Sequence, residues 1–135
     1  MVQVNKRLNG GDNMDECFKQ RKLLANQFKN FQKVFIALGD ETRQQIFMAL
    51  LENDTIGMRV PEITKRTHLS RPAVSHHLKI LKEAGLVNMY RIKTMNYYYI
   101  DTVENCWNGL SMLIDHVNKV ICSANNHGYP NFKEE

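Results

Sequence analysis

A chain of 135 residues with 43% hydrophobic residues is long enough for one ordinary domain with a modest core, and a dimer would bury more. No run of about 18 apolar residues occurs and no apolar stretch follows Lys6 and Arg7, so we expect neither a membrane span nor a signal peptide. Three cysteines are too few, and odd in number, for a disulfide framework, which indicates a reducing cytoplasm.

The two ends of the chain have the composition of tails. Residues 9–13 are Asn-Gly-Gly-Asp-Asn, a run that does not nucleate regular structure, and residues 125–135 contain the helix breakers Gly128 and Pro130. We therefore predict a disordered tail over 1–13, a single domain over 14–124 and a frayed tail over 125–135.

Residues 15–38 have the apolar spacing of a helix. Five apolar side chains recur at steps of four, three, four and three residues, which places them on one helical face: Leu24, Phe28, Phe31, Phe35 and Leu38. A break near Asn30 would divide this segment into two helices, and the periodicity leaves that choice open.

Gly39 and Asp40 supply a stop signal and a new N-cap, because an aspartate side chain accepts hydrogen bonds from the amides of a first helical turn. The pattern then predicts a helix over 42–51. Its inward-facing residues are expected to be Ile46, Phe47, Leu50 and Leu51.

Residues 60–85 predict a short helix, a tight turn and a second helix. Pro61 suits the first turn of the short helix, which buries Val60 and Ile63, and Leu69 fills the turn. Ser70 is a natural N-cap for the second helix, and Gly85 ends it. The core face of that helix is Val74, Leu78 and Leu81, and the side chains left outside are Arg71, Ser75, His76, Lys79 and Lys82.

The next residues predict a β-hairpin. Residues 86–92 and 97–100 have strong strand propensity, and the four residues 93–96 that join them have a length that fits a hairpin loop. Asn96 is the loop residue that most readily takes a positive φ. The expected fold class is mainly α with a small β-hairpin, which is a winged helix-turn-helix.

The last helix is predicted over 103–123. Val103, Trp107, Leu110, Ile114, Val117 and Ile121 step by four and three residues, which makes a heptad seam. The helix is too long for one small core to cover, so we expect a dimer through the N- and C-terminal helices. The predicted domain thus has an N-terminal helical dimer region (14–38), a winged helix-turn-helix core (39–101) and a dimerisation helix (102–124).

Positive charge gathers on the helix-turn-helix. Residues 59–93 contain eight Lys or Arg and two Glu, a net charge of +6, whereas the whole chain has only +4. DNA-binding surfaces need this concentration of charge, because neutralising phosphates supplies most of the non-specific affinity.

Three stretches between Phe35 and Ile100 carry a known pattern. Residues 37–43 read Ala-Leu-Gly-Asp-Glu-Thr-Arg, residues 69–87 run from Leu69-Ser70-Arg71 to Gly85-Leu86-Val87, and the hairpin contains Tyr97-Tyr98. These stretches resemble the A-L-x-D-x-T-R motif, the recognition-helix signature and the tyrosine pair of the ArsR-type (ArsR/SmtB-like) family of bacterial winged-helix regulators. The resemblance implies a cytoplasmic homodimer that represses transcription at an operator of two inverted half-sites and that responds to an effector.

The resemblance also implies site residues. It assigns base contacts to Arg71, Ser75 and His76, and it places Ser70 near a phosphate. Arginine suits guanine O6 and N7, which it contacts with two hydrogen bonds. Pro72 lies in the same first turn. The DNA backbone is expected to be contacted by Lys65, Arg66 and Lys79. In the wing, Arg91 and Lys93 are expected to touch phosphates. Lys79 and Lys82 fit a merely solvated helix face equally well, and His77 is expected to face the scaffold.

The wing departs from the family pattern Arg-x-Gly-Arg. Here the residues are Arg91, Ile92, Lys93 and Thr94, so lysine replaces the turn glycine and threonine replaces the second arginine. A minor-groove arginine at the tip of the wing is therefore not predicted.

Two types of family metal site are incomplete in this sequence. One needs cysteines on the helix before the turn, but residues 59–66 contain neither cysteine nor histidine. The other matches only at His116 and His127, because Ile114 and Pro130 replace its remaining ligands, whereas zinc needs four good ligands. We expect no metal cofactor, and an effector outside the common metal set.

Three further interpretations stay open or are disfavoured. Cys17, Cys106 and Cys122 would act as a redox or soft-metal sensor if their helices pack together, but a lone cysteine such as Cys106 is more often a small hydrophobe in the core. A winged-helix module that binds protein is disfavoured by the charge of +6. An enzyme is not expected, because Ser75, His76 and His77 are neighbours on one helix and do not converge on a substrate.

Overall fold

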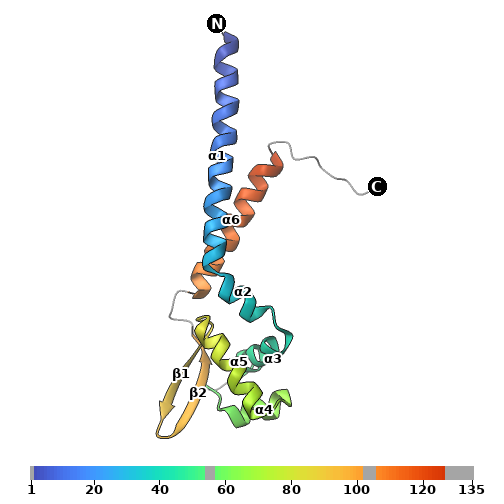
Figure 1. The fold of residues 1–135 in the computed structure, drawn as a ribbon, viewed down its shortest axis with the longest axis vertical. Coiled ribbons are helices and arrows are strands. Elements are labelled where there is room, and N and C mark those ends of the chain that lie inside the picture. Colours follow the sequence, from blue (N-terminus) through green and yellow to red (C-terminus); the bar gives the residue numbers. More distant parts are fainter. Residues whose placement is uncertain (1, 54–56, 102–105, 127–135) are drawn as a thin grey trace, which may run out of the picture. The chain divides into compact units, whose positions relative to one another are not determined.

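The computed structural model describes residues 2–53, 57–101 and 106–126, and the side chains of residues 16–53, 57–101 and 106–122. Its elements in chain order are α1 (Val2–Asn30), α2 (Gln32–Leu38), α3 (Glu41–Leu51), α4 (Val60–Thr67), α5 (Arg71–Glu83), β1 (Val87–Ile92), β2 (Met95–Ile100) and α6 (Cys106–Asn126) (Figure 1). The chain divides into two compact units, residues 1–30 with 109–135 and residues 31–108. We call them the helical unit and the winged unit.

The segment 14–124, predicted to be a single domain, contains parts of both units. Helix α6 begins in the winged unit and continues into the helical unit. A helix can pass between two units in this way because its backbone hydrogen bonds run along its own axis and do not depend on one core.

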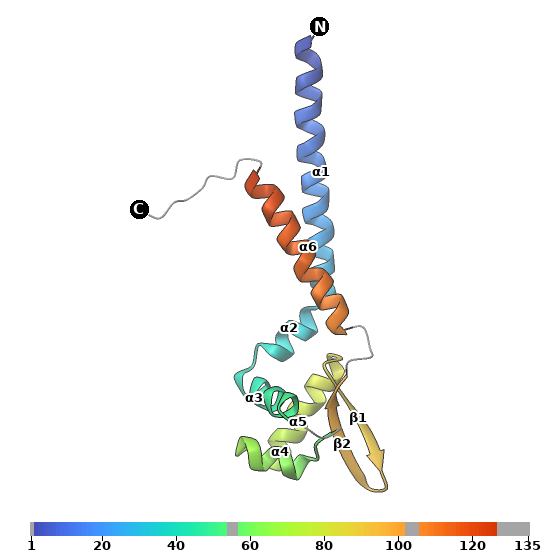
Figure 2. The same cartoon turned by 180° about the vertical axis from the view of Figure 1, so that it is seen from behind.

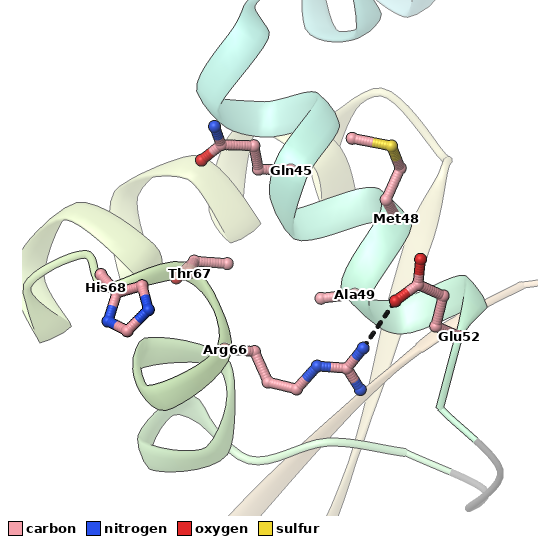
Figure 3. A pocket seen from close by; sticks show the side chains of 7 residues that line it. All are labelled: Gln45, Met48, Ala49, Glu52, Arg66, Thr67 and His68. Carbon is pink, nitrogen blue, oxygen red and sulfur yellow. Dashed lines mark hydrogen bonds and ion pairs between the residues drawn. The ribbon is translucent and has the colours of Figure 1, made fainter.

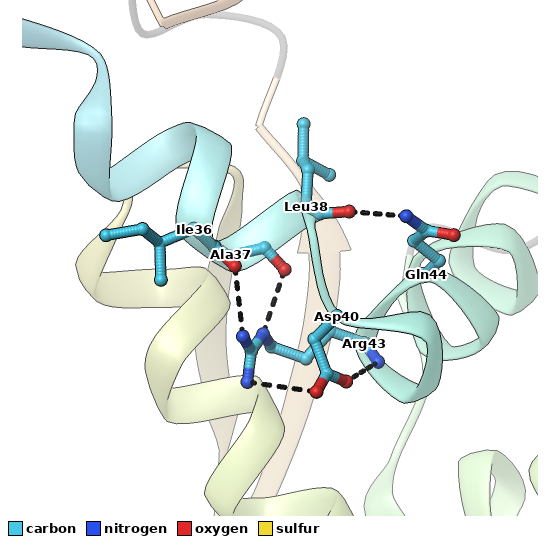
Figure 4. Close-up of polar contacts among 6 residues, drawn as sticks. All are labelled: Ile36, Ala37, Leu38, Asp40, Arg43 and Gln44. Carbon is cyan, nitrogen blue, oxygen red and sulfur yellow. Dashed lines mark hydrogen bonds and ion pairs between the residues drawn. The ribbon is translucent and has the colours of Figure 1, made fainter.

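Helices α2 and α3 meet at a corner that side chains fix in place (Figure 4). Asp40 is the N-cap of α3, and its Oδ1 accepts a hydrogen bond of 2.9 Å from the backbone N–H of Arg43. The Arg43 guanidinium donates to the backbone carbonyls of Ala37 and Ile36 at 2.8 and 3.0 Å. The side-chain amide of Gln44 donates to the backbone carbonyl of Leu38. The last carbonyls of α2, which lack helical partners, are thus satisfied by α3.

The break near Asn30 is present, since α1 ends at that residue and α2 begins at Gln32. In α3 the inward-facing residues are Ile46, Ala49 and Leu50, and Phe47 is half-buried. The prediction for Leu51 was wrong, because its side chain is 60% exposed. Leu51 lies one residue beyond Leu50, which turns it about 100° around the helix and away from the core.

The core of the winged unit lies between its helices and the hairpin. Several of its side chains are fully buried, and they come from five successive elements or connections: Ile46, Ile63, Val74, Leu78, Leu81, Leu86 and Val87. Figures 1 and 2 show α3, α4 and α5 gathered on one side of this unit, with the hairpin beside α5. The predicted core face of α5 is confirmed.

The hairpin is tighter than predicted. Its strands pair antiparallel from Val87 with Ile100 to Ile92 with Met95, so only Lys93 and Thr94 form the turn. The four-residue loop and a positive φ at Asn96 were therefore wrong, and Lys93 has the positive φ, at 57°. Two-residue turns are favoured because their twist matches that of the strands, and they require a positive φ at the first turn residue.

The chain before α4 also joins the hairpin. Met58 and Tyr98 exchange two backbone hydrogen bonds of 2.8 Å. A Cβ at Gly57 would lie 3.1 Å from the Cβ of Tyr97 and 3.2 Å from the carbonyl oxygen of Tyr98. Glycine therefore allows the close approach of this segment to β2.

The helical unit contains α1 and most of α6. A ring nitrogen of His116 and the Gln27 side-chain oxygen lie 2.6 Å apart, which connects the two helices. Several large apolar side chains of the unit are exposed: Phe18, Leu23, Phe28, Met112, Ile114 and Ile121. No helix within the described ranges is both long and apolar enough to cross a membrane.

The ends of the chain differ from the expected tails. Residues 2–13 belong to α1, where a disordered tail was predicted, because a glycine inside a helix costs only about 1 kcal/mol while each added residue gains a hydrogen bond. Helix α6 continues to Asn126, so residues 125 and 126 are helical and not part of a frayed tail. Residues 127–135 lie outside the described residues, as does the predicted helix start at Val103.

Candidate nucleic-acid interface

Helix α5 has two distinct faces. Val74, Leu78 and Leu81 are fully buried in the winged unit, and Ile80 is half-buried. Every side chain predicted to remain outside is exposed: Arg71, Ser75, His76, Lys79 and Lys82. The hydroxyl of Ser70 accepts a hydrogen bond of 3.3 Å from the Ala73 amide, which makes Ser70 the N-cap, and Pro72 lies in the first turn. The helix start is therefore well defined, and Arg71 and Ser75 lie one turn apart beside it.

The end of α5 is equally well defined. Gly85 has a φ of +80°, and the Leu86 amide donates to the carbonyl of Leu81 at 3.0 Å. This left-handed glycine closes the helix in a Schellman-type arrangement. The exposed face of α5 thus belongs to a helix that is capped at both ends and packed through Val74, Leu78 and Leu81.

His77 is the exception on this helix, as expected. It is half-buried, and its Nδ1 is buried without a hydrogen-bond partner in the structure. The Asp40 carboxylate lies close enough to interact with it electrostatically. His77 therefore faces the scaffold around the α2–α3 corner, whereas its neighbour His76 is exposed.

Helix α4 contributes two cations to this part of the surface. Lys65 and Arg66 lie in the last turn of α4, and both are exposed. His68 ends the helix with a φ of 58°, and its amide donates to the carbonyl of Thr64 at 2.8 Å. Arg66 also donates to Glu52 of α3 at 2.7 Å (Figure 3), a contact between residues fourteen apart that sequence reasoning missed. No local motif links these two residues, so only the fold reveals the pair.

The wing has two exposed cations beside its turn. Arg91 Nε donates to the carbonyl of Lys93 at 3.0 Å, which holds the arginine against the turn. The rings of Tyr90 and Tyr97 stack with centroids 5.2 Å apart and planes 7° apart, and Tyr99 lies against Tyr90 at 5.7 Å. Cross-strand aromatic pairs of this kind stiffen a two-stranded ribbon.

The three cysteines lie in different surroundings. Cys106 is in the winged unit, where its thiol donates weakly to the carbonyl of Ala84 at 3.9 Å, and burial raises its pKa. Cys17 is half-buried and Cys122 is exposed, and both belong to the helical unit. Among the described residues no three His, Cys, Asp or Glu side chains come together as a metal site, and His127 lies outside them. The contacts of Cys106 fit the packing interpretation.

The model of the bacterial regulatory protein arsR family matches residues 40–89, which include α3, α4, α5 and the start of β1. The regulator MJ1325 of Methanocaldococcus jannaschii is 39% identical over 74 residues, covering 55% of this chain and 81% of that protein. The transcriptional repressor SdpR of Bacillus subtilis is 31% identical over 86 residues, covering 64% of this chain and 91% of SdpR. The transcriptional activator HlyU of Vibrio cholerae is 31% identical over 105 residues, covering 76% of this chain and 90% of HlyU.

Two solved structures have the same fold. The ArsR family regulator RHA00566 superposes with a TM-score of 0.58 at 17% identity, covering 73% of this chain and 94% of that one. An ArsR-like regulator from Rhodococcus sp. RHA1 superposes with a TM-score of 0.57 at 22% identity, covering 75% of this chain and 88% of that one. The chain is therefore a winged helix-turn-helix protein, and it belongs to the arsR family of bacterial DNA-binding transcriptional regulators, not to an enzyme family.

Proposed function

We propose that this protein is a repressor that binds an inverted-repeat operator as a homodimer in the cytoplasm. The observation that supports base recognition most directly is the exposed polar face of α5, on the side opposite to the fully buried Val74, Leu78 and Leu81. SdpR is a repressor and HlyU is an activator, so repression rests on the family resemblance and has to be measured.

In this proposal the start of α5 reads bases. The first residues of a recognition helix reach base edges in the major groove, and here these are Arg71, Ser75 and His76. Ser70 and Pro72, at the N-cap and in the first turn, would meet the sugar-phosphate backbone. Lys65, Arg66 and Lys79 would neutralise phosphates on either side of the helix, which fixes position without reading sequence.

The wing would contact the backbone through Arg91 and Lys93. Arg91 is held by its hydrogen bond to the turn, so its position is set before DNA binds. Lys93 and Arg91 are both exposed on a ribbon that stacked tyrosines stiffen. These contacts would add affinity and salt dependence more than base preference.

A second copy of the chain is the proposed cover for the helical unit. Six large apolar side chains of this unit are exposed: Phe18, Leu23 and Phe28 on α1, and Met112, Ile114 and Ile121 on α6. Where such side chains form one patch, the patch commonly marks a protein interface. The heptad seam of α6 favours pairing with an identical helix.

The effector is proposed to lie outside the common metal set, because the two family metal sites lack ligands. A thiol sensor is the second candidate, and Cys17 and Cys122 are its better residues. The raised pKa of Cys106 leaves less of the reactive thiolate at neutral pH. A protein with all three cysteines changed to serine that still responds fully to oxidants or soft metals would exclude this candidate.

The test is fluorescence anisotropy of the reduced, metal-free protein on DNA from upstream of its own gene, with scrambled DNA of equal length, across a salt series. We expect tight, sequence-selective and salt-dependent binding of two chains per site. Affinity that does not change with salt and shows no DNA preference would favour a protein-binding module and contradict the proposal.

A further inference from the structure

The ion pair between Arg66 and Glu52 has a geometry that bears on DNA binding. Arg66 Nη2 lies 2.7 Å from Glu52 Oε2, with side chains 39% and 69% exposed. Figure 3 shows the guanidinium extending from α4 toward the end of α3, along one side of a pocket of about 320 Å³. The cation thus points toward α3 and its carboxylate partner.

The charge pattern around this pair makes it distinctive. Lys65, the neighbouring cation of α4, forms no salt bridge within the described part of the chain. Neither do Glu62 and Glu83, the two acidic residues of the basic segment 59–93. Glu52 lies outside that segment in sequence, yet it neutralises one of the segment's cations in space.

We propose that Glu52 competes with DNA phosphate for Arg66 and so limits the protein's affinity for all DNA. In the free protein the Glu52 carboxylate accepts a charged hydrogen bond from the Arg66 guanidinium. DNA binding must either exchange that carboxylate for a phosphate or leave Arg66 out of the contact. The proposal rests on the proposed function, in which α4 faces the DNA backbone.

The expected effect is modest and independent of sequence. Exposed ion pairs contribute only about 0.2–1 kcal/mol, so a phosphate exchanges with Glu52 at low cost. Removing the carboxylate should raise affinity about two- to fivefold, on operator and scrambled DNA alike. The plot of log affinity against log salt should steepen by up to about 0.9, the value for one added phosphate contact.

The test compares Glu52→Gln with Glu62→Gln by anisotropy on operator and scrambled DNA across a salt series. Glu62 is the matched control, because it is an exposed glutamate on the same helix as Arg66 and the same charge is removed. We expect the larger gain and the steeper slope only for Glu52→Gln. In an Arg66→Gln background, Glu52→Gln should gain no more than Glu62→Gln, and thermal melting of each variant verifies folding.

The outcomes separate this proposal from the proposed function. A Glu52→Gln protein that binds no better than Glu62→Gln, or that binds more weakly, would overturn it, because Glu52 would then be neutral or would position Arg66 for phosphate. If wild type binds DNA selectively and with salt dependence, and Arg66→Gln binds with the same affinity, the competition by Glu52 is overturned. The proposed function then remains intact. Wild-type protein without salt-dependent binding would overturn both.

Discussion

The winged unit and the helical unit differ in how they cover their apolar residues. In the winged unit, Ile63, Leu78 and Leu86 are fully buried within one chain. In the helical unit, Leu110 and Leu113 are buried but Phe18, Met112 and Ile114 are more than half exposed. The winged unit also exposes Ile36 and Leu51, but most of the buried apolar side chains in the described residues belong to it. Exposed apolar faces commonly mark protein interfaces, so this difference agrees with the proposal that a second chain covers the helical unit.

The largest expected effect is in the winged core. Leu78→Ala should lower the free energy of unfolding by about 2–5 kcal/mol, because it removes a fully buried side chain and leaves a cavity. Leu51→Ala is the matched control and should change stability by only about 0.5 kcal/mol or less, since Leu51 is exposed. Urea denaturation measures both, and equal losses would contradict the core assigned here.

The second effect tests the helical unit. Ile114→Asp places a carboxylate on the exposed apolar face of α6 and should weaken self-association by tenfold or more, since burying an unpaired charge costs several kcal/mol. Sedimentation velocity over a concentration series measures the dissociation constant. The Ile114→Asp variant should have the same circular dichroism spectrum as wild type, which verifies folding. An unchanged dissociation constant would place the dimer interface elsewhere.

The third effect concerns the α2–α3 corner. Asp40→Ala removes the N-cap of α3 and should lower the free energy of unfolding, because the Arg43 amide loses its hydrogen-bond acceptor. Asp40 also makes stability depend on pH, because its hydrogen bond from the Arg43 amide lowers its pKa. The stabilisation is complete above the ordinary aspartate pKa of about 4 and is lost as the pH falls through the lower folded value. Asp40→Ala should therefore flatten the acid limb of a stability curve, and an unchanged limb would contradict the assignment.

The smallest effect concerns the wing turn. Lys93 adopts a positive φ that glycine takes without strain, so Lys93→Gly should stabilise the protein by up to about 1 kcal/mol. Thr94→Gly is the control, because Thr94 is not among the residues with positive φ and should lose stability instead. The same sign for both variants in thermal melting would contradict the turn geometry.

Much of the winged unit could be predicted from local signals. Ser70, Gly85 and the spacing of Val74, Leu78 and Leu81 defined α5, because caps and periodicity act within a few residues. The hairpin turn was mispredicted because strand pairing, not the preference of Asn96, selected the turn residues. The Arg66–Glu52 pair joins separate helices and could not be seen without the fold.

Base reading by α5 can be tested by selecting binding sites from a random pool of double-stranded DNA with wild type, Arg71→Ala and Lys82→Ala. We expect wild type to select an inverted repeat. Arg71→Ala should lose the base preference at one base pair of each half-site and should bind the wild-type site more weakly by about 1–3 kcal/mol. Lys82→Ala should select the same motif. An identical motif and affinity for Arg71→Ala would contradict base reading by α5.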